Sequence, residues 1–260
     1  MFRPKSPDAP PDAPPDAPDA PPDAPDAPSE KGSPMKLQLT IDHGKDFEVI
    51  ALVEKLSPVV DVVEIGYPML LTFGLEYVRG IRERFPDVEL CLDAKVFHGG
   101  TGITRRCFEC GADTVSVLGV APDPVISKMV EKAHGYGGKV MCDMAGVRNI
   151  TQRTAEVDEL GVDIVDVPSG FRPEYDYDIE SHRGTIRAWF NRVNPLDLAK
   201  AAQRNLRHAQ LAVSTGINES NIREVVALGP ELVLVGRGIL DNEDRVAAAE
   251  RLKRYLPFEG

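Results

Sequence analysis

The sequence predicts a single α/β domain of the (β/α)8 (TIM) barrel class, and three observations lead to this prediction. From Met35 onward, short apolar runs alternate with longer amphipathic stretches, as in a chain of βα units. The runs are almost continuous in Val, Ile and Leu, which is typical of parallel strands buried on both faces. The 35–260 range is close to the roughly 250 residues that such a barrel usually needs.

Eight apolar runs are predicted to be strands, which is the number that closes this barrel. They are LQLTID (37–42), VVDVVEIG (59–66), VELCLDAK (88–95), DTVSVLG (113–119), KVMCDM (139–144), VDIVDVP (162–168), QLAVSTG (210–216) and ELVLVG (231–236).

The segments between these runs are predicted to be helices. PDPVISKMVEKAHGYG and NIREVVALG have apolar residues three and four apart and end in glycine. A Gly-Ala/Val-Asp turn recurs before two strands, in GADTVSV and GVDIVDV, and marks the helix-to-strand junction. An open, doubly wound sheet is the structural alternative. No G-x-G-x-x-G follows the first strand, which disfavours that alternative.

Two segments do not fit the βα repeat. Residues 1–34 repeat Pro-Asp-Ala units and hold twelve of the 22 prolines, so we expect a disordered tail before a 35–260 barrel. Residues 171–194, after the sixth strand, are polar and aromatic and too long for an ordinary βα loop. This insertion is either a lid over the mouth of the barrel or a surface excursion.

Composition excludes several classes of protein. A net charge of −11 argues against a nucleic-acid-binding surface but allows a local basic pocket for an anion. No run approaches the roughly 20 apolar residues of a membrane helix, and we expect a cytoplasmic protein without a membrane partner. One C-x-x-C pair without a second pair at zinc spacing favours cysteines that pack as small apolar groups. The cysteines are Cys91, Cys107, Cys110 and Cys142.

Charged residues follow several of the predicted strands. In a barrel, side chains at the carboxyl ends of the strands converge on one site. Buried carboxylates are costly unless a cation accompanies them, so several acids and a lysine in one mouth suggest a Mg²⁺ site with a neighbouring lysine. The alternative for each acid is a helix cap or a structural ion pair. These residues are Asp42, Glu64, Asp93, Lys95 and Asp143.

The last two strands end in STGI and VGRGI, and this pattern predicts a phosphate site. Gly216 and Gly236 let backbone N–H groups approach an anion, and Arg237 adds a fixed fork of donors. Barrels often bind phosphate after strands seven and eight. Tight turns without a ligand are the alternative, which leaves Arg237 unexplained.

From Met35 to its end, the chain resembles 3-hexulose-6-phosphate synthase and 3-keto-L-gulonate-6-phosphate decarboxylase, of the orotidine monophosphate decarboxylase superfamily. The resemblance runs through MKLQLTID, DVVEIGYP, the D-x-K of LDAK, GADTVSVLGVAPD, KVMCDM and ALGPELVLVG with the RGI that follows. VLGVAPD and VMCDM look closer to the synthase.

The resemblance implies roles for the residues at the strand ends. Glu64 and Asp93 would hold Mg²⁺, Lys95 would hydrogen-bond a developing enediolate, and Asp42 would orient substrate hydroxyls. The resemblance also implies a homodimer, in which the second acid of the D-x-K-x-x-D motif reaches the partner's site. The phosphate would be held by Gly216, Gly236 and Arg237.

The chain departs from the family pattern at two positions. His98 stands where the motif has its last Asp, and Pro168 stands where a segment like VHTG has its histidine. Either His98 has become the general acid/base, or proton transfer has been lost while metal and phosphate binding remain. His182 and Arg183 in the insertion are further candidates for the missing group.

We therefore expect a Mg²⁺-dependent carbon–carbon lyase or synthase that acts on a ketose phosphate through an enediolate. Lys95, His98 and Asp143 are the expected catalytic residues. Formaldehyde-fixing aldol chemistry is the first hypothesis, decarboxylation of a 3-keto sugar-acid phosphate the second, and epimerisation of a pentulose phosphate the third. The alternative from another class is a non-catalytic protein that binds a sugar phosphate.

Overall fold

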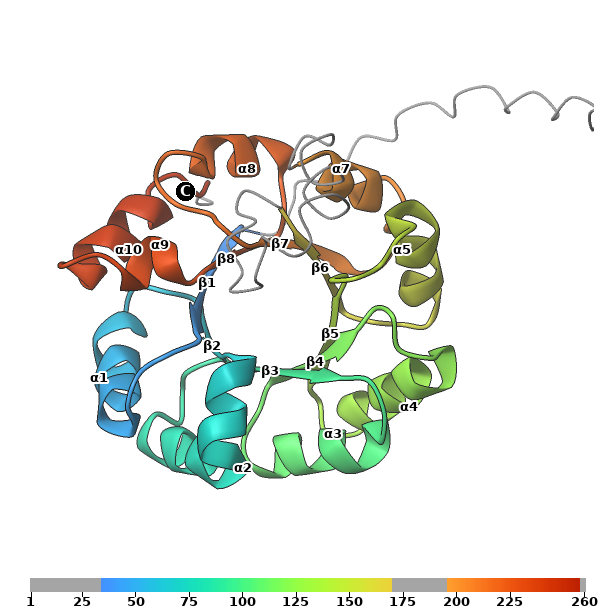
Figure 1. Ribbon diagram of the computed structural model, residues 1–260, viewed down its shortest axis with the longest axis horizontal. Helices are drawn as coiled ribbons and strands as arrows, with labels where there is room; N and C mark the ends of the chain where they lie inside the picture. The colour runs from blue at the N-terminus through green and yellow to red at the C-terminus, as the bar shows by residue number, and fades with distance from the viewer. Residues whose placement is uncertain (1–33, 170–195, 258–260) are drawn as a thin grey trace, which may run out of the picture. The chain divides into compact units, whose positions relative to one another are not determined.

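The computed structural model describes residues 34–169 and 196–257, and it confirms the predicted barrel. Eight parallel strands follow each other around the barrel in chain order, and β1 closes it by pairing with β8 (Figure 1). Helices surround the strands on the outside. The predicted tail, apart from Pro34, and the predicted insertion at 171–194 lie outside the described residues.

Each strand lies at one of the eight predicted runs, with ends that differ by a few residues. The strands are β1 (Lys36–Ile41), β2 (Val62–Ile65), β3 (Leu90–Val96), β4 (Thr114–Leu118), β5 (Lys139–Asp143), β6 (Ile164–Pro168), β7 (Gln210–Ser214) and β8 (Leu232–Val235). The helices are α1 (Asp46–Leu56), α2 (Tyr67–Arg84), α3 (Gly100–Glu109), α4 (Asp123–His134), α5 (Ile150–Glu159), α7 (Asp197–Gln203), α8 (Ile222–Leu228), α9 (Arg237–Leu240) and α10 (Arg245–Lys253).

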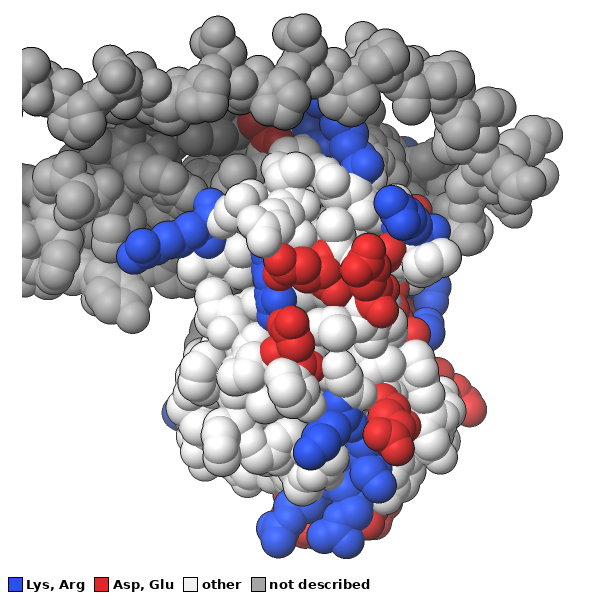
Figure 2. Space-filling model, turned by 90° about the vertical axis from the view of Figure 1, so that its right-hand side faces the viewer, with Lys and Arg blue, Asp and Glu red and all other residues white. Residues whose placement is uncertain are grey.

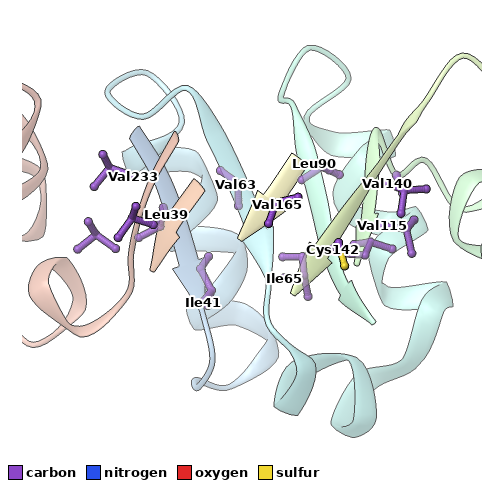
Figure 3. Packing of buried hydrophobic residues seen from close by; sticks show 14 of the residues in the cluster. Leu39, Ile41, Val63, Ile65, Leu90, Val115, Val140, Cys142, Val165 and Val233 are labelled. Carbon is purple, nitrogen blue, oxygen red and sulfur yellow. The ribbon is translucent and has the colours of Figure 1, made fainter. Parts of the chain in front are cut away.

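The strands separate two apolar layers because successive side chains point to opposite faces. The larger layer lies between the strands and the helices, and Figure 3 shows part of it, including Leu39, Val63 and Val115. The smaller layer lies inside the barrel and fills its floor. It consists of Val62, Cys91, Met141, Ile164, Ala212, Leu232 and Leu234.

Acidic residues just before the strands fasten the base of the barrel. In each case a carboxylate accepts a hydrogen bond from a backbone N–H group at the start of the preceding strand, where a buried amide needs a partner. Two of these acids belong to the Gly-Ala/Val-Asp junctions that the sequence repeats. The bonds run from Leu37 N to Asp61 (2.8 Å), Leu90 N to Asp113 (2.7 Å), Val140 N to Asp163 (2.8 Å) and Leu211 N to Glu231 (2.8 Å).

A glycine directly follows the last residue of α4 and of α8, as predicted, but the two glycines differ in conformation. Gly229 ends α8 in the left-handed conformation, with φ of 76°. Gly135, after α4, keeps a right-handed conformation, and the left-handed residue is Gly137. Gly135 and Gly137 belong to the same turn before β5, so the left-handed residue lies two positions further along this turn.

The four cysteines are buried thiols without a disulfide, as expected for small packing groups. Burial raises the pKa of Cys107 to about 12, which keeps this thiol protonated and unreactive near neutral pH. On the face drawn in Figure 2, acidic and basic side chains are interspersed. Among the described helices, none is both long and apolar enough to cross a membrane.

Candidate active site

A pocket of about 1080 Å³ opens at the carboxyl ends of the strands. It brings together all but one of the predicted site residues, which come from β2, β3, β5 and the segments after β1, β7 and β8. Inward side chains of the lower layer, Met141 and Leu234, form its floor. The predicted residues that line the pocket are Asp42, Glu64, Asp93, Lys95, Asp143, Gly216, Gly236 and Arg237.

Lys95 is held between two carboxylates. Its Nζ atom lies 2.5 Å from Oδ2 of Asp143 and 3.1 Å from Oδ2 of Asp93. Burial lowers the pKa of Lys95, but the neighbouring Asp143 and Asp93 outweigh burial, and the net shift is upward. The lysine is therefore a fixed positive charge in the mouth of the barrel.

An irregular backbone at the end of β3 determines the position of Lys95 in the pocket. The pairing of β3 with β4 shifts register between Leu92 and Val96, and Lys95 has a φ of 43°, which is uncommon for a residue other than glycine. Ser116 on β4 secures the distortion: its hydroxyl accepts a hydrogen bond from Lys95 N and donates one to Asp93 Oδ1, both at 2.8 Å. The bulge thus places both motif residues on the pocket wall.

Glu64, Asp42 and Asp93 form a group of three carboxylates in the pocket. Burial, followed by the nearby charges of Asp93 and Asp42, raises the pKa of Glu64 well above its ordinary value. Burial and then Asp93 also raise the pKa of Asp42. Glu64 is oriented by Gln38, whose Nε2 donates a hydrogen bond to it. Because these negative charges repel one another, a bound cation would stabilise the group.

Glu64 and Asp93 have the chemistry of a small divalent-metal site. Within residues 34–169 and 196–257, no three His, Cys, Asp or Glu side chains are arranged to enclose a metal ion. Mg²⁺ is usually bound by only one or two carboxylates, with water and substrate oxygens as the remaining ligands. Two carboxylates in an open pocket, where the charge of Asp93 helps to raise the pKa of Glu64, fit such an ion.

Gly66 is required for the position of Asp42. A Cβ atom at Gly66 would collide with Oδ1 of Asp42 and lie 2.9 Å from the Ile41 carbonyl oxygen. The first turn of α2 therefore passes directly beside the carboxylate. This close approach explains the glycine at the end of the VVEIG run.

The segments after β7 and β8 form a concave backbone surface. Thr215 and Gly216 have consecutive left-handed φ values of 70° and 74°, a conformation that turns neighbouring N–H groups toward one side. The turn is fixed by Asn221, whose Nδ2 donates to the Gly216 carbonyl oxygen at 2.9 Å. Gly236 and the exposed Arg237 complete this wall of the pocket. It has the donors that a phosphate group needs.

His98 is the predicted residue that the fold does not bring to the pocket of its own chain. It follows the β3 bulge, in an exposed stretch before α3, and does not line the cavity. Pro168, at the end of β6, does line it. The candidates His182 and Arg183 lie outside the described residues.

Sequence reasoning missed Asp166 and His43, which also line the pocket. His43 directly follows Asp42, so the predicted place of Asp42 in the site was a signal that His43 also lies there. The signal for Asp166 was the two-residue period of VDIVDVP, which places Asp166 on the same strand face as Pro168. An acid on the inner face of a barrel strand is costly without a partner, and this cost marks it as a site residue.

Comparison with known proteins gives the family of this chain. A family model described as orotidine 5'-phosphate decarboxylase / HUMPS family matches residues 35–178, which is more than half of the chain. The chain belongs to the orotidine 5'-phosphate decarboxylase / HUMPS family. The predicted family is thereby confirmed, and with it the prediction of an enzyme of the carbon–carbon lyase type.

Relatives and solved structures align with this chain over almost their whole length. The 3-hexulose-6-phosphate synthase of Staphylococcus epidermidis is 34% identical over 222 residues, 85% of this chain and 99% of the relative. The crystal structure of 3-hexulose-6-phosphate synthase from Salmonella typhimurium has a TM-score of 0.74 and 28% identity, and covers 85% of this chain and 98% of that chain. The 3-keto-L-gulonate-6-phosphate decarboxylase of Vibrio cholerae, at 21% identity and a TM-score of 0.69, covers 86% of this chain and 100% of that chain and shows the shared fold.

Proposed function

We propose that this protein is a Mg²⁺-dependent aldol synthase that joins formaldehyde to ribulose 5-phosphate and forms a hexulose 6-phosphate. The observation that carries the proposal is the Lys95 ammonium group, fixed at 2.5 Å from Asp143 and 3.1 Å from Asp93 at the mouth of the barrel. The 3-hexulose-6-phosphate synthase of Staphylococcus epidermidis, at 34% identity, supports this choice of substrates.

Lys95 is the residue that would stabilise the enediolate of the sugar phosphate. Its charge is held in place by Asp143, so little reorganisation is needed when negative charge develops on the substrate oxygen. Glu64 and Asp93 would hold Mg²⁺, which when bound supplies positive charge to the same oxygens. Asp42 would orient substrate hydroxyls from the β1 side of the pocket.

The phosphate group would bind at the far wall. Consecutive left-handed residues Thr215 and Gly216 present backbone donors, and Gly236 and Arg237 stand beside them in the pocket lining. The charge of Arg237 offsets the surrounding acids, as its lowering effect on the pKa of Asp42 indicates. An overall negative protein can therefore bind a small anion at this place.

We further propose a homodimer formed through the α2 and α3 side of the barrel. Large apolar side chains are exposed there, with Leu71 at 70%, Phe97 at 52% and Ile103 at 39% exposure. α2 and α3 are neighbours on the outside of the barrel (Figure 1). His98, next to Phe97, would then reach the site of the partner rather than that of its own chain.

The proposal is tested by formaldehyde uptake with ribulose 5-phosphate and Mg²⁺. We expect wild-type activity, loss of at least about 100-fold in Asp93→Asn, and wild-type activity in Asp87→Asn. Asp87 is an exposed acid before β3 at the other end of the barrel, so it controls for the change in charge. Mg²⁺ is expected to raise the thermal midpoint of the wild type but not of Asp93→Asn.

A wild type that takes up no formaldehyde would contradict the proposed reaction. Release of carbon dioxide from a 3-keto sugar-acid phosphate would instead assign decarboxylation, which passes through the same kind of enediolate. Uptake that proceeds equally after removal of divalent metal would contradict the role of Glu64 and Asp93.

A further inference from the structure

Asp166 is a buried carboxylate that faces the pocket and lacks a complete set of partners. Its exposure is 6%, and it lies on the inner face of β6. Ser214 on β7 donates a hydrogen bond to Oδ2 at 3.0 Å. Oδ1 has no hydrogen-bond partner in the described part of the chain. A buried acceptor without a donor is costly, and a ligand in the pocket is one way to supply the donor.

The position of Asp166 separates it from the metal-binding pair. Glu64 is on β2, and β6 is the fourth strand from β2 in either direction around the closed ring of eight. The two carboxylates therefore belong to opposite walls of the same pocket. Pro168, the next inward residue of β6, has no group that exchanges protons. Among the described residues of β6 that line the pocket, Asp166 is the side chain that can exchange protons.

We propose that Asp166 is the catalytic acid/base residue of this pocket. The inference rests on the proposed aldol reaction. The Asp166 carboxylate takes a proton from the carbon beside the ketone of ribulose 5-phosphate, the C–H electron pair forms the enediolate double bond, and the carbonyl electrons move to oxygen. The enediolate carbon then attacks formaldehyde, and the Asp166 carboxylic acid returns the proton to the new alkoxide oxygen. Asp166 ends as a carboxylate.

The charged surroundings of Asp166 suit this cycle. Burial, and then Asp143 on the neighbouring strand, raise its pKa well above the ordinary value of 3.8. Lys95 opposes this shift, as does the hydrogen bond from Ser214, while Asp93 adds to it. Glu64 faces it from across the pocket, and the Cys91 thiol lies in the layer below. A carboxyl group whose pKa is raised is a stronger base for the carbon-bound proton, and its acid form can return that proton to the alkoxide.

The experiment measures two reactions in wild type and Asp166→Asn. One is exchange of the carbon-bound proton of ribulose 5-phosphate with deuterium oxide, followed by NMR in the presence of Mg²⁺ and without formaldehyde. The other is formaldehyde uptake. We expect Asp166→Asn to lose about 10²- to 10⁴-fold in both rates, with the KM for ribulose 5-phosphate changed by less than about threefold if only the proton transfer step is lost.

Asp163→Asn is the matched control. Asp163 precedes the same strand, but its carboxylate accepts the Val140 N–H at the base of the barrel. We expect this variant to lower the thermal midpoint and to leave both rates per folded molecule unchanged. Asp166→Asn is expected to keep the wild-type midpoint, because it removes a poorly paired buried carboxylate.

Ser214→Ala provides a second measurement. Because the Ser214 hydroxyl lowers the pKa of Asp166, its removal is expected to move the acidic limb of the kcat profile to higher pH. A role in structure alone would leave this limb in place. Active wild type with an equally active Asp166→Asn variant would overturn the inference and leave the proposed reaction standing. A wild type that shows neither exchange nor uptake would overturn both.

Discussion

The side-chain nitrogen of Lys95 lies 2.5 Å from Oδ2 of Asp143, a residue 48 positions later in the chain. This contact joins β3 to β5 across the mouth of the barrel, and Asp143 Oδ1 is itself fixed by the N–H of Ala145 at 2.8 Å. The amine therefore has a defined position before substrate arrives. Such preorganisation is what makes a cation effective against developing negative charge.

Replacement of Lys95 by methionine tests this role. The variant keeps the length of the side chain and removes the charge, so kcat for formaldehyde uptake is expected to fall about 10²- to 10³-fold. Lys139→Met is the control, since Lys139 pairs with Glu89 at 3.6 Å at the base of β5. Equal activity in the two variants would show that Lys95 does not act on the substrate.

Gly66→Ala is expected to disturb the site through Asp42. The added methyl group would collide with Oδ1 of Asp42, so either the carboxylate or α2 must move, at a cost of about 1–3 kcal/mol in the free energy of unfolding. We also expect a higher KM for the sugar phosphate. At Gly80, in the same helix, a new Cβ would meet no atom within 4 Å beyond the neighbouring backbone of the helix, so Gly80→Ala is expected to be neutral or slightly stabilising. Denaturant titration and steady-state kinetics measure both effects.

Asp158 is expected to be important for stability and not for chemistry. This 2% exposed acid of α5 accepts backbone N–H groups from Arg207, His208 and Ala209 at 2.7–3.1 Å, and so fastens the segment before β7. Asp158→Ala leaves these donors without their acceptor and is expected to lower the free energy of unfolding by at least about 3 kcal/mol.

The neighbouring exposed Glu159 is the control for this substitution. Glu159→Ala is expected to change stability by less than about 0.5 kcal/mol. A small effect of Asp158→Ala in urea titration would mean that other contacts hold the β7 junction. A changed KM in that variant would mean that the junction also shapes the pocket.

The acids of the pocket predict how stability depends on pH. Folding raises the pKa of Glu64 well above 4.5, so between these two values the folded state binds more protons than the unfolded state. The free energy of unfolding contributed by this group therefore falls as pH rises from about 4.5 through the raised pKa. In denaturant titrations of metal-free protein, the free energy of unfolding is expected to fall less steeply with pH in Glu64→Gln than in the wild type. An unchanged slope would mean that Glu64 titrates alike in the folded and unfolded chain.

The sequence by itself determined the barrel and most of the pocket. Strands buried on both faces need near-continuous apolar runs, and this requirement is visible in single runs such as KVMCDM and ELVLVG. In a parallel barrel all the strand ends meet at one face, so Glu64, Asp93 and Arg237 could be placed in one site without knowledge of any distance.

The tertiary structure alone decided which of these side chains meet. The bulge in β3 turns Lys95 toward Asp143 and sends His98 to the outside, and such an irregularity has no signature in the LDAKVFH segment. Periodicity puts Asp166 on the inner face of its strand, but only barrel closure sets β6 opposite β2 and shows that Oδ1 has no donor among the described residues. Periodicity fixes the face on which a residue lies, because it is a property of one strand. Partners, burial and charge depend on strand register and closure, which are properties of the whole barrel.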